Sequence, residues 1–141
     1  MKYVVDASVG FKWVVLEALS DKAQLLRDDY RNGIHELLAP DFFPLEVAHA
    51  LTRAERQNRL TAPQGGILWA DVMTTCPQLF PAIPHVPRAY DIASKARIGI
   101  YDCLYVALAE REKCELVTAD DKLVKTLQQG FPFIRHLSTL P

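Results

Sequence analysis

The sequence has little net charge, because its 16 Lys and Arg residues nearly balance its 17 Asp and Glu residues. The formal charge of −1 excludes a global basic field for nucleic-acid binding, so any such contact needs a local basic face or a metal ion. No apolar run approaches the roughly 20 residues of a membrane-spanning helix. Asp6 also interrupts the apolar start too early for a signal peptide. We therefore expect no contact with a membrane.

Cysteine is also scarce. Cys76, Cys103 and Cys114 are odd in number and too widely spaced for a zinc site or a disulfide framework. Unpaired cysteines of this kind are typical of a reducing compartment, so we expect a cytoplasmic location. The chain also lacks repeats, low-complexity segments and flexible linkers. Half of its 141 residues are hydrophobic, enough for a sizeable core, and we predict a single domain over residues 1–141.

Strand and helix patterns alternate along the chain. Short apolar, β-branched segments predict strands at 3–5, 36–39, 115–118 and 133–134, with at best a proline-containing edge strand at 79–83. Apolar spacing and helix-capping residues predict helices at 7–17, 21–31, 45–59, 62–76, 87–98, 101–110 and 122–129. Asp6 or Ser8, Ser20 and Thr61 are the expected caps. This alternation predicts an α/β fold with a mostly parallel central sheet.

Four acids occupy junctions that lead into predicted helices: Asp6, Glu46, Asp102 and Asp120. In a parallel sheet the carboxyl ends of the strands share one edge, where these side chains can converge. Converging carboxylates repel one another unless a cation neutralises them. Oxygen donors without His or Cys partners favour Mg²⁺ or Mn²⁺. The simpler alternative is that each acid only caps its own helix.

The acids lie in motifs that strongly resemble those of PIN domains. The motifs are Val4–Ser8, Pro44–Val47, Tyr101–Ala109 and Leu116–Asp120. Their order, their spacing and the length of the chain resemble most closely the VapC-type toxin ribonucleases of toxin–antitoxin pairs. The resemblance implies a three-layer α/β/α sandwich and an endoribonuclease that depends on Mg²⁺ or Mn²⁺.

The resemblance also assigns roles to individual residues. The acidic quartet that binds metal and performs catalysis is matched by Asp6, Glu46, Asp102 and Asp120, and the supporting hydroxyl positions by Ser8 and Thr118. The implied reaction is hydrolysis of RNA by metal-activated water, leaving a 5′-phosphate and a 3′-hydroxyl. The general base and the number of metal ions stay open. RNA, a cognate antitoxin and a second copy of the chain are the expected partners.

Other functions remain as alternatives: a PIN-like nuclease of RNA processing without a toxin role, and a non-catalytic interaction domain. A haloacid-dehalogenase-like phosphatase needs a second Asp where Ser8 stands, and a receiver domain needs an acid beside Asp6. A single Glu46–His49 pair is weak support for a helix-bundle metal site. The basic residues that contact RNA also stay open. The candidates are a cluster of helix-end arginines, Arg53, Arg56 and Arg59, and a pair close before Asp102 that is slightly better placed, Lys95 and Arg97.

Overall fold

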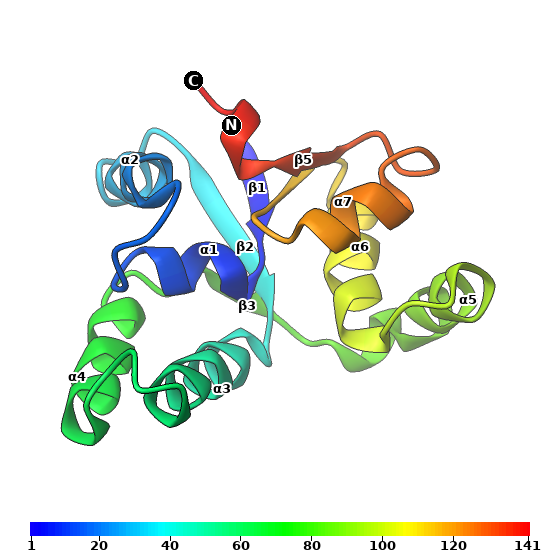
Figure 1. The fold of residues 1–141 in the computed structure, drawn as a ribbon. Coiled ribbons are helices and arrows are strands. Elements are labelled where there is room, and N and C mark those ends of the chain that lie inside the picture. The colour runs from blue at the N-terminus through cyan, green and yellow to red at the C-terminus, as the bar shows by residue number, and fades with distance from the viewer.

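The structure is a computed structural model that describes residues 1–141. Five strands form one parallel sheet in the order β3-β2-β1-β4-β5 (Figure 1). The strands are β1 (Lys2–Val5), β2 (Glu36–Pro40), β3 (Gln78–Phe80), β4 (Glu115–Thr118) and β5 (Ile134–His136). The predicted parallel sheet is thus confirmed, and of the segment 79–83, expected as an edge strand at best, only the first two residues belong to the edge strand β3.

Helices cover both faces of the sheet. They are α1 (Ala7–Lys12), α2 (Ser20–Arg31), α3 (Phe43–Arg56), α4 (Ala62–Met73), α5 (Val86–Ala96), α6 (Ile100–Glu112) and α7 (Asp121–Leu127). Two 3₁₀ turns lie at Ile83–His85 and Leu137–Thr139. Figure 1 shows α1 to α4 on one side of the sheet and α5, α6 and α7 on the other. Crossover connections between parallel strands are right-handed, so the chain changes face when the strand order changes direction. The result is the expected three-layer α/β/α sandwich.

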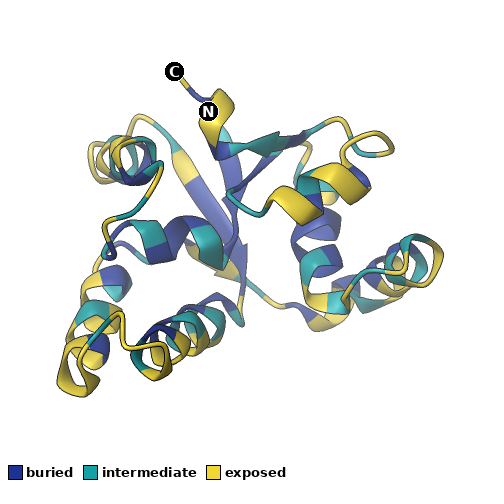
Figure 2. Cartoon of the chain, viewed as in Figure 1, coloured by how far each residue is buried: buried dark blue, intermediate teal, exposed yellow.

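The hydrophobic core surrounds the central strands, and its 34 buried side chains form one cluster. In β1, Tyr3, Val4 and Val5 are all buried, as the apolar run predicts for a strand covered on both faces. Figure 2 shows the burial concentrated in the sheet and on the helix faces that meet it. Cys103 joins this core, whereas Cys114 is only half-buried. None of the helices combines the length and the apolar character that crossing a membrane requires.

The first helix is shorter than the predicted range 7–17, because α1 ends at Lys12. In the segment that follows, side chains bind the backbone carbonyls of the loop. Lys12 Nζ donates to the carbonyl of Ala18 at 2.9 Å. Ser20 Oγ donates to the carbonyl of Val15 at 3.1 Å. These bonds stabilise a folded loop in place of another helical turn.

One predicted helix cap was wrong, and another occupies its predicted position without a capping bond. Ser20 is the first residue of α2, and the cap position is taken by Leu19 in the left-handed region, at φ 70°. Thr61 does precede α4, but its side chain makes no capping hydrogen bond. Asp6 is the cap of α1, as one of the two predictions for that helix had it, because its carboxylate accepts from the backbone N–H of Ser8.

The order of the strands places one particular crevice. From β1 the chain adds β2 and β3 on one side of the sheet and later β4 and β5 on the other. The connections that leave β1 and β4 therefore cover opposite faces, and a crevice opens between the carboxyl ends of these two strands. Asp6 directly follows β1, and Asp120 comes two residues after β4, so both lie at this crevice.

Candidate active site

Asp6 is the buried centre of the site. Its carboxylate is held at both oxygens: Oδ1 accepts from the Ser8 hydroxyl at 2.5 Å and Oδ2 from the Thr118 hydroxyl at 2.5 Å. Burial raises the pKa of Asp6 to about 6, against the lowering effect of these two hydrogen bonds. The nearby charges of Asp102 and Asp120 raise this pKa further, which places both carboxylates within electrostatic reach of Asp6.

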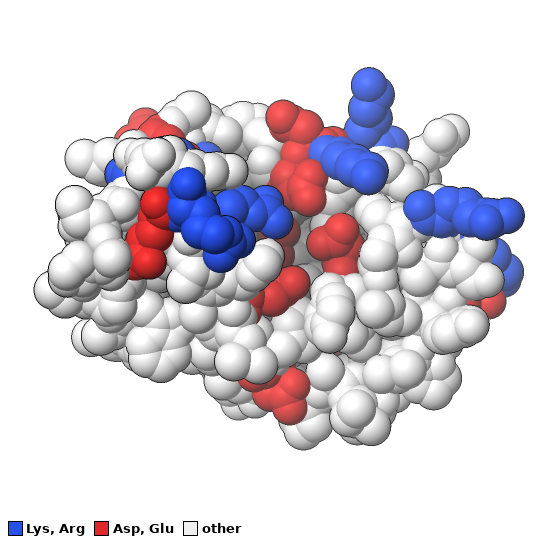
Figure 3. All heavy atoms as spheres, turned by 60° about the horizontal axis from the view of Figure 1, so that its bottom comes forward, with Lys and Arg blue, Asp and Glu red and all other residues white.

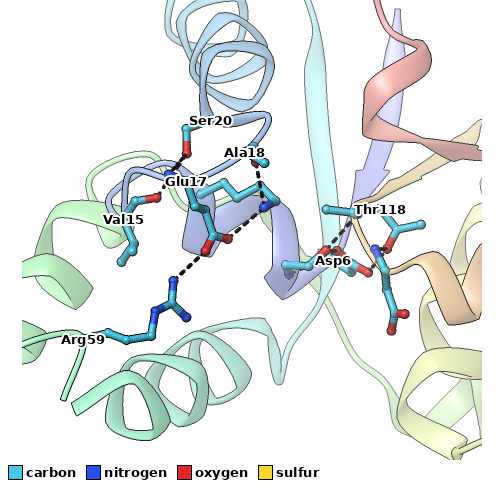
Figure 4. A network of polar contacts seen from close by, with 11 residues as sticks. Asp6, Val15, Glu17, Ala18, Ser20, Arg59 and Thr118 are labelled. Atoms are coloured by element: carbon cyan, nitrogen blue, oxygen red, sulfur yellow. Dashed lines mark hydrogen bonds and ion pairs between the residues drawn. The ribbon is translucent and has the colours of Figure 1, made fainter. Parts of the chain in front are cut away.

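The two predicted supporting hydroxyls join the ends of β1 and β4. Thr118 is fully buried, and its Oγ1 donates to Asp6 while it accepts the backbone N–H of Asp120 at 3.0 Å. Ser8 Oγ donates to Asp6 and accepts the backbone N–H of Ala119 at 3.0 Å. Figure 4 shows Asp6 and Thr118 pointing toward each other across the two strand ends. Ser8 and Thr118 therefore fix the orientation of Asp6.

Glu46 enters the site from the first turn of α3, after the proline at the start of that helix. The hydroxyl of Tyr105, on α6, donates to Glu46 Oε1 at 2.8 Å across 59 residues of sequence. Burial raises the pKa of Glu46, the bond from Tyr105 opposes this rise, and the charge of Asp102 adds to it. Glu46 is therefore tied to α6 and lies within electrostatic reach of Asp102.

Tyr105 is the residue that the sequence analysis missed. Its ring is buried, and burial together with the charges of Glu46 and Asp6 raises its pKa well above the ordinary value. Its hydroxyl therefore stays protonated and acts as a donor. A signal was present in the sequence, because Tyr105 follows Asp102 by three residues and so shares a face of the helix with it.

The other two acids come from α6 and from the start of α7. Asp102 is half-buried in the first turn of α6, where burial and the charge of Asp120 raise its pKa and Lys122 lowers it. Asp120 caps α7, since its Oδ1 accepts the backbone N–H groups of Lys122 and Leu123 at 2.9 and 3.3 Å. The capping alternative is thus correct for Asp6 and Asp120, and both caps also lie at the crevice.

None of the four acids forms an ion pair with a basic side chain, although ten pairs of Lys or Arg with a carboxylate occur elsewhere in the chain. Figure 3 shows acidic side chains gathered in a hollow of one face, with basic side chains on either side. No three His, Cys, Asp or Glu side chains stand close enough to hold a metal ion in this conformation. The donors nevertheless suit a hard divalent cation, because they are all oxygen and no basic side chain forms an ion pair with them.

The other residues considered from the sequence have different surroundings. His49 is exposed and approaches Arg53, at 3.5 Å between Nε2 and Nη2. Arg59 is paired with Glu17 at 2.7 Å, and Lys95 with Asp91 at 3.0 Å. Arg56 and Arg97 are exposed. The structure thus brings none of these basic side chains into contact with the acids.

Comparison with known proteins gives consistent matches over most of the chain. The family model of the PIN domain matches residues 3–126. VapC ribonuclease Mb0985 of Mycobacterium bovis is 31% identical over 122 residues, which are 84% of this chain and 94% of that protein. Ribonuclease VapC1 of Mycobacterium tuberculosis is 32% identical over 126 residues, which are 85% of this chain and 86% of that protein.

A solved structure shares the fold. The crystal structure of PAE2754 from Pyrobaculum aerophilum superposes with a TM-score of 0.70 at 22% sequence identity. The match covers 99% of this chain and 94% of that one. At this identity the likeness concerns the fold, and it agrees with the parallel sheet and the three layers described above. The match to the family model and the identity to the two VapC relatives together show that this chain belongs to the PIN-domain family.

Proposed function

We propose that this protein is an endoribonuclease that depends on Mg²⁺ or Mn²⁺ and hydrolyses phosphodiester bonds of RNA. One observation carries the proposal: none of the four acids has a basic partner, and the pKa values of Asp6, Glu46 and Asp102 are raised. A fold that gathers such charge favours a divalent cation from outside. The names of the curated relatives, which are ribonucleases, support RNA as the substrate.

The surroundings of the four acids suggest different roles for them. Asp6, whose orientation is fixed by Ser8 and Thr118, would hold the cation together with Asp102 and Asp120. When bound, the ion would supply Lewis acidity toward the phosphoryl oxygen and lower the pKa of water. Glu46 binds Tyr105 through Oε1, so its Oε2 stays available to orient the attacking water and accept its proton. The expected products carry a 5′-phosphate and a 3′-hydroxyl.

A cleavage assay tests the metal dependence. A labelled single-stranded RNA is incubated with the purified protein in Mg²⁺, in Mn²⁺ or in EDTA. We expect cutting with either metal, none in EDTA, and none by Asp102→Asn with metal present. Asp28→Asn is the matched control, because Asp28 is exposed on α2, away from the crevice, and it should cut like the wild type. Undiminished cutting in EDTA would refute the proposal.

We further propose that the nuclease is the toxin of a toxin–antitoxin pair. The unopposed charge at the crevice favours an inhibitor that places an Arg or Lys against the acids, in place of the metal ion. A neighbouring reading frame for a DNA-binding antitoxin, whose product stops the cleavage, would support this role. A cognate complex that inhibits while it leaves the crevice open would exclude this mode of inhibition. Assembly as a homodimer stays a prediction.

A further inference from the structure

A second pocket lies directly beside the acids, between α1 and α3. It has a volume of about 320 Å³, and its lining includes Ser8 and Ala119 at one end. These are the residues that connect Asp6 to the end of β4, since Ser8 Oγ bonds to both Asp6 and the Ala119 N–H. The α1–α3 pocket, as we call it, therefore opens next to the proposed site of cleavage.

The charge of the α1–α3 pocket is opposite to that of the acid crevice. Lys12, Arg53 and Arg59 line it, and Glu17 is its one carboxylate. The surplus is two positive charges with His49 neutral, in a protein whose formal charge is −1. Arg53 forms no ion pair, and its contact with the His49 ring, at 3.5 Å, leaves its charge unopposed. A ligand with evenly spaced negative charges can place one of them in this cationic pocket while its neighbour lies at the acid crevice.

Two of the cations are already held in place. Glu17 binds Lys12 Nζ at 2.8 Å through Oε1 and Arg59 Nη2 at 2.7 Å through Oε2 (Figure 4). These partners lower the pKa of Glu17 against the effect of its burial, so it stays ionised. The backbone N–H of Glu17 donates to Ser20 Oγ at 3.0 Å, which anchors the loop at the start of α2. The cations therefore lose little conformational freedom when an anion binds.

We propose that the α1–α3 pocket binds the phosphodiester backbone of the RNA strand next to the bond that is cut. The inference rests on the proposed function, because it takes the acid crevice as the place of cleavage. The sequence left open which basic residues contact RNA. The pocket favours Arg53 and Arg59 over Lys95 and Arg97. Backbone contacts of this kind position the strand without reading its bases.

RNA binding without metal tests the pocket separately from cleavage. The wild-type protein in EDTA is titrated into a fluorescent 12-nucleotide RNA, and anisotropy gives Kd at several KCl concentrations. Arg53→Gln should raise Kd by about fivefold to tenfold at low salt, to the same extent for oligo-U and oligo-A. The slope of log K against log[salt] should fall by about 0.7 for one lost phosphate contact to a single strand. With Mn²⁺ present, KM for cleavage should rise in parallel.

Two matched controls remove one positive charge each. Arg31 is the last residue of α2 and precedes the amino end of β2, whereas the acids lie at the carboxyl ends of the strands, so Arg31→Gln should bind as the wild type does. Arg97 directly follows α5, on the other face of the sheet from α1 and α3, so Arg97→Gln should weaken binding less than Arg53→Gln. Melting temperatures verify that all three variants fold.

The outcomes separate this inference from the proposed function. If the wild type cleaves RNA and Arg53→Gln binds RNA as well as Arg31→Gln does, RNA binding at the pocket is refuted and the proposed nuclease activity is retained. A weaker, less salt-dependent Arg53→Gln complex without any cleavage would support the pocket as an RNA site and overturn the nuclease. Undetectable binding by the wild type at low salt, or a larger effect of Arg97→Gln, would also overturn the pocket.

Discussion

Asp6 and Asp120 each serve the fold and the proposed site at once. Both carboxylates cap a helix, and both lie where β1 and β4 end. A cap uses the carboxylate as an acceptor for backbone N–H groups, which places its charge at a helix N-terminus, where negative charge is favoured. Asp102 differs, because no hydrogen bond to its side chain offsets its burial. Burial therefore opposes its charge without a side-chain hydrogen bond to compensate.

Tyr105 should act as a positioning residue for Glu46. Tyr105→Phe removes the 2.8 Å hydrogen bond and leaves Glu46 free to rotate, so kcat should fall about tenfold with little change in KM. The free energy of unfolding should fall by only about 1 kcal/mol, because water can solvate the half-exposed Glu46. Steady-state cleavage and urea unfolding measure the two effects.

The control for this variant is Tyr30→Phe. Tyr30 lies on α2, which carries none of the four acids, and its hydroxyl donates to the carbonyl of Cys76 at 2.9 Å. Removing this hydroxyl should lower the free energy of unfolding by a similar amount and leave kcat unchanged. Equal kcat values for the wild type and Tyr105→Phe would show that Tyr105 serves packing alone.

At the scale of elements, the approach of α1 to α3 sets the distance between Asp6 and Glu46. The contact is close at Gly10, where an added Cβ would lie 2.8 Å from Cζ of Phe43. Phe43 is fully buried, so its ring has no room to move away. A glycine here lets the two helices pack at a distance that no larger side chain permits.

Gly10→Ala should therefore destabilise the protein. Overpacking costs about 1–3 kcal/mol, and the better helix propensity of Ala returns up to about 1 kcal/mol, which leaves a net loss. Cleavage should slow as well, because α3 carries Glu46. The control is Gly66→Ala in α4, where an added Cβ meets nothing within 4 Å, so stability should rise by up to about 1 kcal/mol. Urea unfolding of both variants measures the difference, and two changes of the same sign would contradict this packing argument.

For the whole molecule, the unopposed acids make stability depend on pH and on metal. The folded-state pKa values of Asp6, Glu46 and Asp102 are raised, so the native state binds more protons than the unfolded chain. Their contribution to stability is complete below the unfolded carboxyl pKa of about 4. It is lost as the pH rises through the raised values, which reach about 6 for Asp6. The metal-free protein should therefore lose stability between about pH 4 and pH 6 from these groups.

Asp102→Asn removes one of these charges at nearly constant volume. The metal-free variant should be more stable than the wild type at pH 7 by about 1 kcal/mol, after allowance for solvent screening at this half-buried site. Saturating Mn²⁺ should stabilise the wild type, by about 2.7 kcal/mol at a hundred times Kd, and leave Asp102→Asn unchanged. Thermal melts with and without Mn²⁺ measure both effects. A less stable variant that Mn²⁺ still stabilises would identify Asp102 as a purely structural residue.

The sequence by itself determined the strands, the alternation with helices and the positions of the acids, because these depend on local patterns. A buried parallel strand needs a short apolar run, and an acid placed after it must fall at the edge of the sheet. The tertiary structure alone decided which junctions meet, since the side of the sheet that each strand joins is not encoded locally. It also decided the bond from Tyr105 to Glu46 and the early end of α1, which leaves Glu17 in the loop that binds Lys12 and Arg59. These contacts join residues far apart in the chain, or replace helical hydrogen bonds with side-chain ones, and helical periodicity carries no signal for either.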